Sequence, residues 1–152
     1  MTAGALQSLY QQMITDHSQE RHGFGLQATA EAESHELNAS CGDEVTLQLH
    51  LEPSSNHVTP MSWEAEGCVI STASASMLSD LVRDLTPTDV ASRVDYFLDV
   101  LTSGGTIEPD EDLLGDAVAL QGVAAYPARI KCAMLAWIAC EDALSRLEKT
   151  AS

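Results

Sequence analysis

The segment SCGDEVTLQLHLE, residues 40–52, begins with a cysteine and a carboxylate two positions apart and continues with alternating apolar and polar residues. Successive side chains of a β-strand point to opposite faces, so this alternation predicts a strand with one buried and one wet face. Cys41 and Asp43 then lie at the turn that leads into the strand. The apolar positions are Val45, Leu47, Leu49 and Leu51.

Neighbouring segments extend this strand into a small sheet. A polar turn at 52–57 leads to a returning strand at 58–66, and residues 35–40 supply a third strand after a polar loop at 26–34. The three strands predict an antiparallel meander. Cys68 follows the returning strand and therefore lies at the same end of the sheet as the first turn.

Helical spacing of apolar residues predicts the rest of the fold. Ser71, Thr72 and Ser74 offer N-caps for a helix after the sheet, and Thr86 followed by Pro87 opens the next one. We expect an α+β fold: a small three-stranded antiparallel sheet with one face covered by about five helices. The expected helices are residues 3–17, 71–85, 87–103, 113–120 and 126–147.

Charge and cysteine content restrict the function. The chain of 152 residues carries 23 acidic against 7 basic residues, a net charge of −16. Such a balance argues against nucleic-acid partners and anionic membrane surfaces, which require a basic footprint. No basic-then-apolar leader and no apolar run of membrane-spanning length are present. Four cysteines without a secretory leader favour metal binding or catalysis in a reducing compartment, so we expect a cytoplasmic protein.

Three cysteines and one carboxylate form a complete ligand set for a thiophilic metal such as zinc. The candidates are Cys41, Asp43, Cys68 and Cys132. Cys140 lies eight residues after Cys132, about 12 Å along one helix, and is therefore expected to be a core residue rather than a fifth ligand.

The remaining candidate residues have weaker signals. His17, His22 and His35 form no pair on one helix face, so we do not expect them to be ligands. Arg129 and Lys131 flank the last candidate ligand, at a helix start where the dipole disfavours cations, which favours a role for Arg129 at the site.

A carboxylate ligand among thiolates makes a metal site more prone to ligand exchange. Cys41, next to Gly42, has the backbone freedom to leave the metal and act as a nucleophile toward sulfur.

The chain contains a set of short motifs: Leu9-Tyr10 with Asp16-His17, Cys41-Gly42-Asp43, EGCVIS at 66–71, ASASM at 73–77, ALQGV at 119–123 and YPARIKCA at 126–133. Together they resemble the NifU-like N-terminal family of iron–sulfur assembly proteins, and the last two resemble its SufU branch specifically. The likeness covers residues 6–148, and the segment Gln19–His22 departs from the Asn-Pro-Arg-Asn that family members commonly have there. Lys131, where IscU-type scaffolds place His, and an insertion at 87–112 also indicate the SufU branch.

The resemblance implies a single SufU/IscU-like domain over 1–152, in which Cys41, Asp43, Cys68 and Cys132 bind one zinc ion. It implies that Cys41 accepts a persulfide sulfur from a SufS-type cysteine desulfurase and passes it to the SufB-containing scaffold complex, with Arg129 near the metal. Whether such a persulfide acceptor counts as an enzyme is left open by the sequence.

Other readings of the same residues remain open. The chain is alternatively a scaffold that assembles a labile [2Fe–2S] cluster on the four ligands, since thiolates suit such clusters. A structural metal site in a binding module is a third reading. A cysteine hydrolase is the weakest, because the sequence places no histidine to act as its base.

Overall fold

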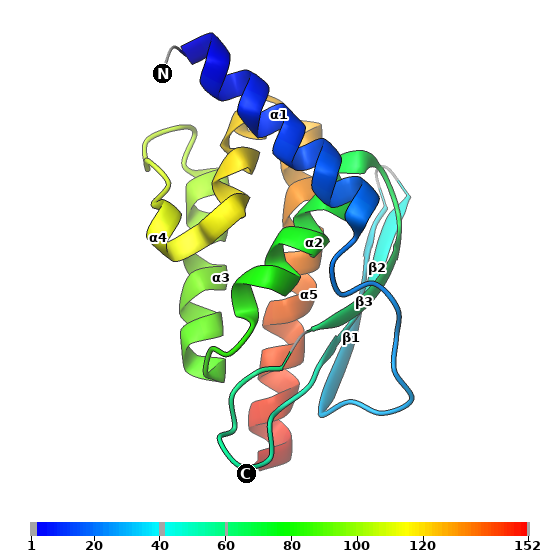
Figure 1. The fold of residues 1–152 in the computed structure, drawn as a ribbon. Helices are drawn as coiled ribbons and strands as arrows, with labels where there is room; N and C mark the ends of the chain where they lie inside the picture. The colour runs from blue at the N-terminus through cyan, green and yellow to red at the C-terminus, as the bar shows by residue number, and fades with distance from the viewer. Residues whose placement is uncertain (1–2, 40–41, 60, 152) are drawn as a thin grey trace.

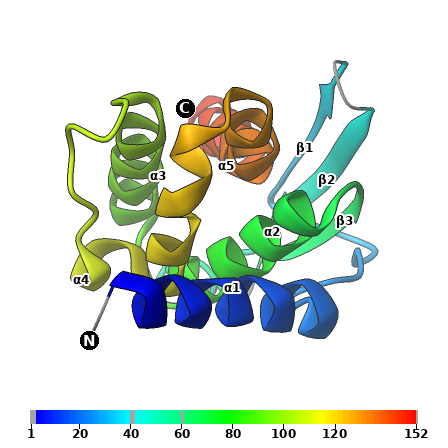
Figure 2. The ribbon, with the colours of Figure 1, turned by 90° about the horizontal axis from the view of Figure 1, so that it is seen from above.

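The chain folds as an α+β structure in which helices gather on one face of a three-stranded sheet (Figures 1 and 2). The structure, a computed structural model, describes residues 3–39, 42–59 and 61–151. The elements are α1 (Ala3–Glu20), β1 (Ala32–Asn38), β2 (Asp43–Leu49), β3 (Ser62–Glu66), α2 (Val69–Val82), α3 (Pro87–Thr102), α4 (Glu111–Leu114), η1 (Gly115–Ala125) and α5 (Pro127–Ala151).

The sheet is an antiparallel meander in the order β1-β2-β3, which confirms the predicted fold class. Leu47 of β2 pairs with Ser34 of β1 on one side and with Trp63 of β3 on the other. All three side chains are buried, and α5 packs against both β1 and β2. The inner face of the sheet therefore meets the long C-terminal helix, as Figure 2 shows.

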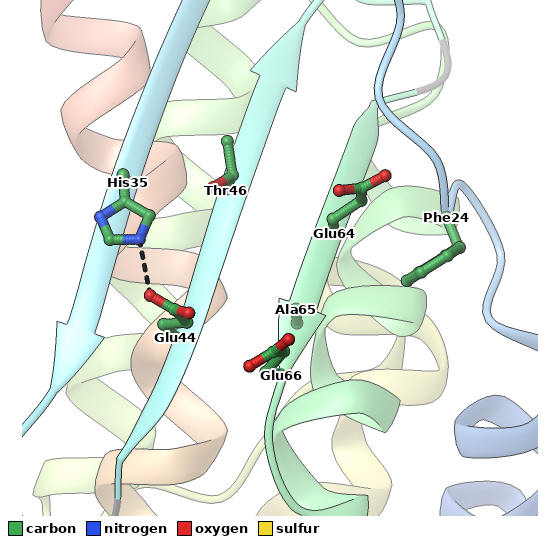
Figure 3. A pocket seen from close by; sticks show the side chains of 7 residues that line it. All are labelled: Phe24, His35, Glu44, Thr46, Glu64, Ala65 and Glu66. Carbon is green, nitrogen blue, oxygen red and sulfur yellow. Dashed lines mark hydrogen bonds and ion pairs between the residues drawn. The ribbon is translucent and has the colours of Figure 1, made fainter.

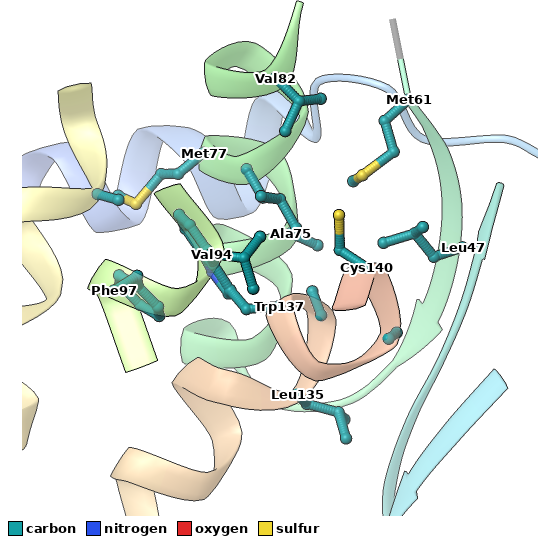
Figure 4. Packing of buried hydrophobic residues seen from close by; sticks show 14 of the residues in the cluster. Leu47, Met61, Ala75, Met77, Val82, Val94, Phe97, Leu135, Trp137 and Cys140 are labelled. Atoms are coloured by element: carbon teal, nitrogen blue, oxygen red, sulfur yellow. The ribbon is translucent and has the colours of Figure 1, made fainter. Parts of the chain in front are cut away.

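Aromatic side chains anchor the core between the helices. Phe97 of α3 stacks on Trp137 of α5 with ring centroids 3.8 Å apart. Cys140, one turn after Trp137, lies near Leu47 and Met61 with none of its surface exposed (Figure 4). The prediction that Cys140 is a core residue is confirmed, and burial raises the pKa of its thiol to about 12.

Four buried serines give helix α2 an unusual inner side. Each hydroxyl contacts a different part of the molecule: Ser71 reaches Asp43, Ser74 reaches the Ala133 carbonyl, Ser76 reaches His17 and Ser79 reaches the Met61 carbonyl. The indole N–H of Trp137 also donates to Ser74 Oγ at 2.8 Å. Hydrogen bonds therefore help to hold this helix in place, in addition to apolar packing. A buried hydroxyl without a partner would lower the stability of the fold.

Some predicted boundaries are wrong. The sheet begins at Ala32, within the predicted loop, because Ser34 turns inward and donates to the Ala139 carbonyl at 2.5 Å. The predicted helix at 113–120 is instead the short α4 followed by the 3₁₀-helix η1, with Gly115 at a φ of +55° between them. Leu51 lies outside β2 in an isolated bridge to Val58.

The capping prediction for α3 is confirmed, since the Thr86 side chain accepts from the Asp89 N–H. In the part of the chain that the structure describes, every helix is too short or too polar to cross a membrane.

Candidate metal centre

Asp43 is the first residue of β2 and points to the inner face of the sheet. The turn before it contains Gly42 at a φ of +76°, whose N–H donates to the Asn38 carbonyl at 2.8 Å. A positive φ is readily adopted by glycine, so Gly42 allows this tight return from β1 to β2. Asp43 is only 6% exposed, which is rare for a carboxylate without dedicated partners.

Cys68 occupies the N-cap position of α2. Its φ of −73° and ψ of 173° are extended, and its backbone N–H donates to Asp43 Oδ2 at 3.4 Å. Ser71, one of the predicted caps, lies inside the first turn, where its hydroxyl donates to the same carboxylate oxygen at 2.6 Å.

The third member, Cys132, lies on α5 and is 7% exposed. One ligand atom each from Asp43, Cys68 and Cys132 lies within 4.8 Å of the others. The three residues come from a strand, a helix cap and a distant helix, so the tertiary fold brings them together. Ser71 Oγ also approaches the Cys132 carbonyl oxygen at 3.3 Å, which links α2 and α5 at this cluster.

Opposing effects set the charge of the Asp43 carboxyl. Burial alone raises its pKa, but hydrogen bonds from the Ser71 hydroxyl, the Cys68 thiol and backbone, and the Cys132 thiol outweigh burial, so the pKa lies below its ordinary value. The carboxylate is therefore ionised at neutral pH and supplies a negatively charged oxygen ligand.

Gly67 lets the carboxylate approach the Cys68 backbone. A Cβ atom at position 67 would lie 2.9 Å from Asp43 Cγ, closer than van der Waals contact allows. Sequence reasoning did not single out Gly67 or the inward role of Ser71. The adjacency of Gly67 to a candidate cysteine was the available signal, because glycine is common where another group approaches the backbone closely.

The donor set fits a thiophilic metal. Two sulfurs and one carboxylate oxygen suit Zn²⁺, which binds four ligands tetrahedrally and leaves one position for a further donor. Cys41 lies outside the described residues, two positions before Asp43. The structure thus brings together three of the four predicted ligands and gives no position for the fourth.

Arg129, the other predicted site residue, is exposed near the start of α5. Its guanidinium carbon lies 5.4 Å from the ring centroid of Tyr126. Together with Tyr10, Ile14 and Ile70 it lines a groove of about 390 Å³ between α1, α2, η1 and α5. Ile70 is the second residue of α2, so one wall of this groove lies two positions after the Cys68 cap.

A comparison with protein families identifies the chain. Residues 9–133, which include both described cysteines of the cluster, match the NifU-like N terminal domain. The chain belongs to the NifU-like N-terminal domain family. Its resemblance to that family at the level of motifs is therefore confirmed.

Curated relatives of this NifU-like chain carry two different names. It is 36% identical over 143 residues to the zinc-dependent sulfurtransferase SufU of Bacillus subtilis (strain 168), with 94% of each chain covered. It is 34% identical over 146 residues to the iron-sulfur cluster assembly scaffold protein IscU of Streptococcus pyogenes serotype M1, covering 96% of this chain and 89% of that one.

Solved structures share its fold. A putative iron-sulfur cluster assembly scaffold protein for the SUF system from Fervidobacterium islandicum AW-1 superposes with a TM-score of 0.76 at 28% identity, covering 91% of this chain and 98% of the other. The N-terminal part of a nitrogen-fixing NifU-like protein from Brucella abortus gives a TM-score of 0.81 at 22% identity, covering 94% and 96%. The latter comparison supports the fold alone.

Two histidines of the NifU-like chain lie together although the sequence predicted no pair. His17 and His22 have ring centroids 5.0 Å apart, and His22 Nδ1 lies 2.7 Å from Asp80 Oδ2. The hydrogen bond with Asp80 raises the pKa of His22. The residues lie on α1, the following loop and α2, so their separation in the sequence concealed the cluster.

His17 also joins Asp116 and Ser76 in the order of a hydrolase triad. Its Nε2 lies 2.9 Å from Asp116 Oδ2, and its Nδ1 lies 2.8 Å from Ser76 Oγ. Ser76 is completely buried, however, and its oxygen accepts the His22 backbone N–H at 2.9 Å. A substrate cannot reach this hydroxyl, so the arrangement does not support serine hydrolysis.

The outer face of the sheet is acidic. A shallow groove of about 350 Å³ crosses it, where Glu44 stands directly opposite Glu66 in the β2–β3 register and contacts His35 at 3.0 Å (Figure 3). Like charges placed opposite each other weaken strand pairing. This face lies opposite the core-facing side, where Asp43 joins the candidate metal ligands Cys68 and Cys132. The groove is lined by Phe24, His35, Glu44, Thr46, Glu64, Ala65 and Glu66.

Proposed function

We propose that this chain is a zinc-dependent sulfurtransferase of iron–sulfur cluster assembly. The observation that carries the proposal is the convergence of Asp43, Cys68 and Cys132 within 4.8 Å. Family membership and the name of the Bacillus subtilis relative, a zinc-dependent sulfurtransferase, support the same function.

Each residue has a role in the proposed transfer. Asp43, Cys68, Cys132 and Cys41 would hold Zn²⁺, which when bound keeps its cysteine ligands as thiolates. Ser71 and the Cys68 N–H hold the Asp43 carboxylate in place. Arg129 would offset part of the negative charge of three thiolates and one carboxylate.

The transfer itself is an exchange between sulfurs. The Cys41 thiolate attacks the terminal sulfur of a persulfide on a partner cysteine desulfurase, forming a new S–S bond on Cys41. The S–S bond of the partner breaks, and the partner cysteine leaves as a thiolate. No net oxidation or reduction occurs. A scaffold complex of the SUF system would then receive the sulfur.

Details of the chain favour the SufU-type over the IscU-type function. Lys131, rather than a histidine, precedes Cys132, and residues 87–112, which contain α3 and an acidic link, correspond to the proposed SufU-type insertion. We propose a SufS-type cysteine desulfurase and a SufB-containing scaffold as partners, and a cytoplasmic location.

A second candidate function uses the same ligands. Relatives named as IscU scaffolds, at 34% and 30% identity, favour assembly of a labile [2Fe–2S] cluster. Thiolates with one carboxylate suit such a cluster as well as zinc. The two functions differ in what the purified protein contains: colourless protein with one zinc per chain, or brown protein with iron and sulfide.

The deciding experiment combines metal analysis with a desulfurase assay. Purified chain is added to the cognate cysteine desulfurase, and sulfide release in the presence of a reductant is measured for wild type and Cys41→Ala. We expect wild type to stimulate release and Cys41→Ala to abolish the stimulation. Undiminished stimulation by Cys41→Ala would remove Cys41 from the reaction, and transfer of a bound cluster to an apo-protein would favour the scaffold.

A further inference from the structure

A second group of metal-binding side chains joins α1, the loop after it and α2. One ring nitrogen each of His17 and His22 and one carboxylate oxygen of Asp80 lie within 4.8 Å of one another. Asp80 is twelve residues beyond Cys68, about 18 Å along α2, so this group is distinct from the cysteine cluster. The group includes His22, the last residue of the segment Gln19–His22, in which the sequence differs from the motif that family members commonly have.

The hydrogen bonds of His17 orient it as a ligand. Asp116 Oδ2 lies 2.9 Å from its Nε2, and an ionised carboxylate only accepts hydrogen bonds, so the ring hydrogen belongs on Nε2. The lone pair of Nδ1 then points toward Ser76, whose oxygen also accepts the His22 N–H. A carboxylate on the far nitrogen is the usual support of a metal-binding histidine.

A metal ion can bind the lone pair of His17 Nδ1 in place of the Ser76 hydroxyl with little loss of hydrogen bonding. The Ser76 hydroxyl is the present partner of Nδ1, and a serine within a helix can donate instead to a carbonyl of the preceding turn. The His17 side chain is 5% exposed, so the solvent-facing part of the group is formed by His22 and Asp80, whose side chains are 37% and 40% exposed. Their contact of 2.7 Å already brings a nitrogen and an oxygen ligand together.

We propose that His17, His22 and Asp80 form a second site, which binds a divalent transition cation such as Zn²⁺, Co²⁺ or Ni²⁺, with Asp116 as the positioning residue of His17. Imidazole and carboxylate donors without sulfur suit these ions. The ion ties the last turn of α1 and the following loop to α2. It leaves the thiolate chemistry of the first site unchanged.

Cobalt titration of the full-length chain tests this site. Metal-stripped protein is titrated anaerobically with Co²⁺ at pH 8, above the ordinary pKa of histidine, and bound metal is counted by equilibrium dialysis. Thiolate ligation produces a charge-transfer absorption band, which reports the cysteine site separately. We expect two Co²⁺ per wild-type chain but one in His22→Gln and Asp80→Asn, with the thiolate band retained. Asp116→Asn should weaken the second ion by about 10–100-fold.

His35→Gln is the matched control. His35 also contacts a carboxylate, Glu44, at 3.0 Å, but no second histidine completes a cluster there among the described residues. This variant should bind two Co²⁺. Saturation of wild type at one ion with the thiolate band, retention of the second ion by His22→Gln, or its loss from His35→Gln would overturn the proposal. If Asp80→Asn fails to fold by circular dichroism, His22→Gln decides, because its side chain is partly exposed at a loop.

Discussion

The Ser71 hydroxyl donates a 2.6 Å hydrogen bond to Oδ2 of Asp43, from the first turn of α2 to the first residue of β2. The contact fixes the only carboxylate of the described cysteine cluster in the orientation that faces Cys68 and Cys132. Such a supporting hydrogen bond orients the ligand and contributes to its affinity for the metal.

Ser71→Ala should therefore weaken zinc binding by about 10–100-fold. It also removes a partner of a buried carboxylate, which should lower the free energy of unfolding by about 1–3 kcal/mol. Competition with a chromophoric chelator measures the affinity. Ser74→Ala is the control, because Ser74 is also buried on α2 but bonds to Ala133 and Trp137. It should lose stability without loss of zinc affinity, and equal zinc loss in both variants would contradict the prediction.

Gly67→Ala should displace the Asp43 carboxylate. The added Cβ would lie 2.9 Å from Asp43 Cγ, so the side chain must move away from the Cys68 N–H. Forcing one extra methyl group into a packed site costs about 1–3 kcal/mol, and zinc affinity should fall with it. Thermal unfolding with and without zinc measures both effects. Gly122→Ala, where a Cβ would meet no atom within 4 Å, should change neither by much.

Cys140 should resist alkylation in the native protein. Its thiol is fully buried with a pKa of about 12, so it stays protonated up to about pH 10 and reagents cannot reach it. Iodoacetamide labelling of metal-free protein, followed by peptide mass mapping, should modify Cys68 readily. Cys140 should react only after denaturation. Modification of Cys140 in folded protein at pH 8 would show that the core at α5 opens.

Because of Glu141, the free energy of unfolding should decrease as the pH rises through the pKa that this carboxyl has in the folded state. Although the Glu141 residue is exposed, partial desolvation, and then the charge and hydrogen bond of Asp95, raise its pKa. A carboxyl with a raised folded pKa stabilises the fold below its unfolded pKa, and that contribution is lost when the group ionises in the folded state. Glu141→Gln should therefore raise the melting temperature relative to wild type at pH 7 and lose this advantage near pH 4.

Asp95→Asn provides the control for Glu141. It removes the same repulsion, so the double variant should gain less than the sum of the single ones. Equal gains at both pH values would show that ionisation of Glu141 is not the cause.

The sheet and the candidate ligands were predictable because their signals are local. Strict alternation after Asp43 specifies a half-buried strand, and the sequence Thr86-Pro87 specifies a helix start. The predicted first strand begins too late because the inner face of β1 contains Ser34, a polar residue whose hydroxyl donates to a carbonyl on α5. Burial of this kind depends on a tertiary partner and leaves no apolar pattern in the sequence.

The support of the cysteine cluster and the histidine cluster were not predictable for the same reason. Serine is a residue type that commonly caps helices, so Ser71 was a natural cap candidate. In the structure Cys68 occupies the N-cap position, and the Ser71 hydroxyl donates to Asp43. His17, His22 and Asp80 come from three separate segments, and no spacing rule joins them.

The four inward serines of α2 have a consequence for how the helix is seated. Leucine and methionine surfaces tolerate rotation or sliding by a fraction of a turn, whereas hydroxyls directed at Asp43, Ala133, His17 and Met61 match their partners in a single register. A variant with alanine at all four positions would keep the apolar contacts of α2 but lose the hydrogen bonds that fix its register. Its Cys68 thiol would then adopt several orientations about the helix axis. A zinc ion would no longer meet a single, preorganised arrangement of ligands.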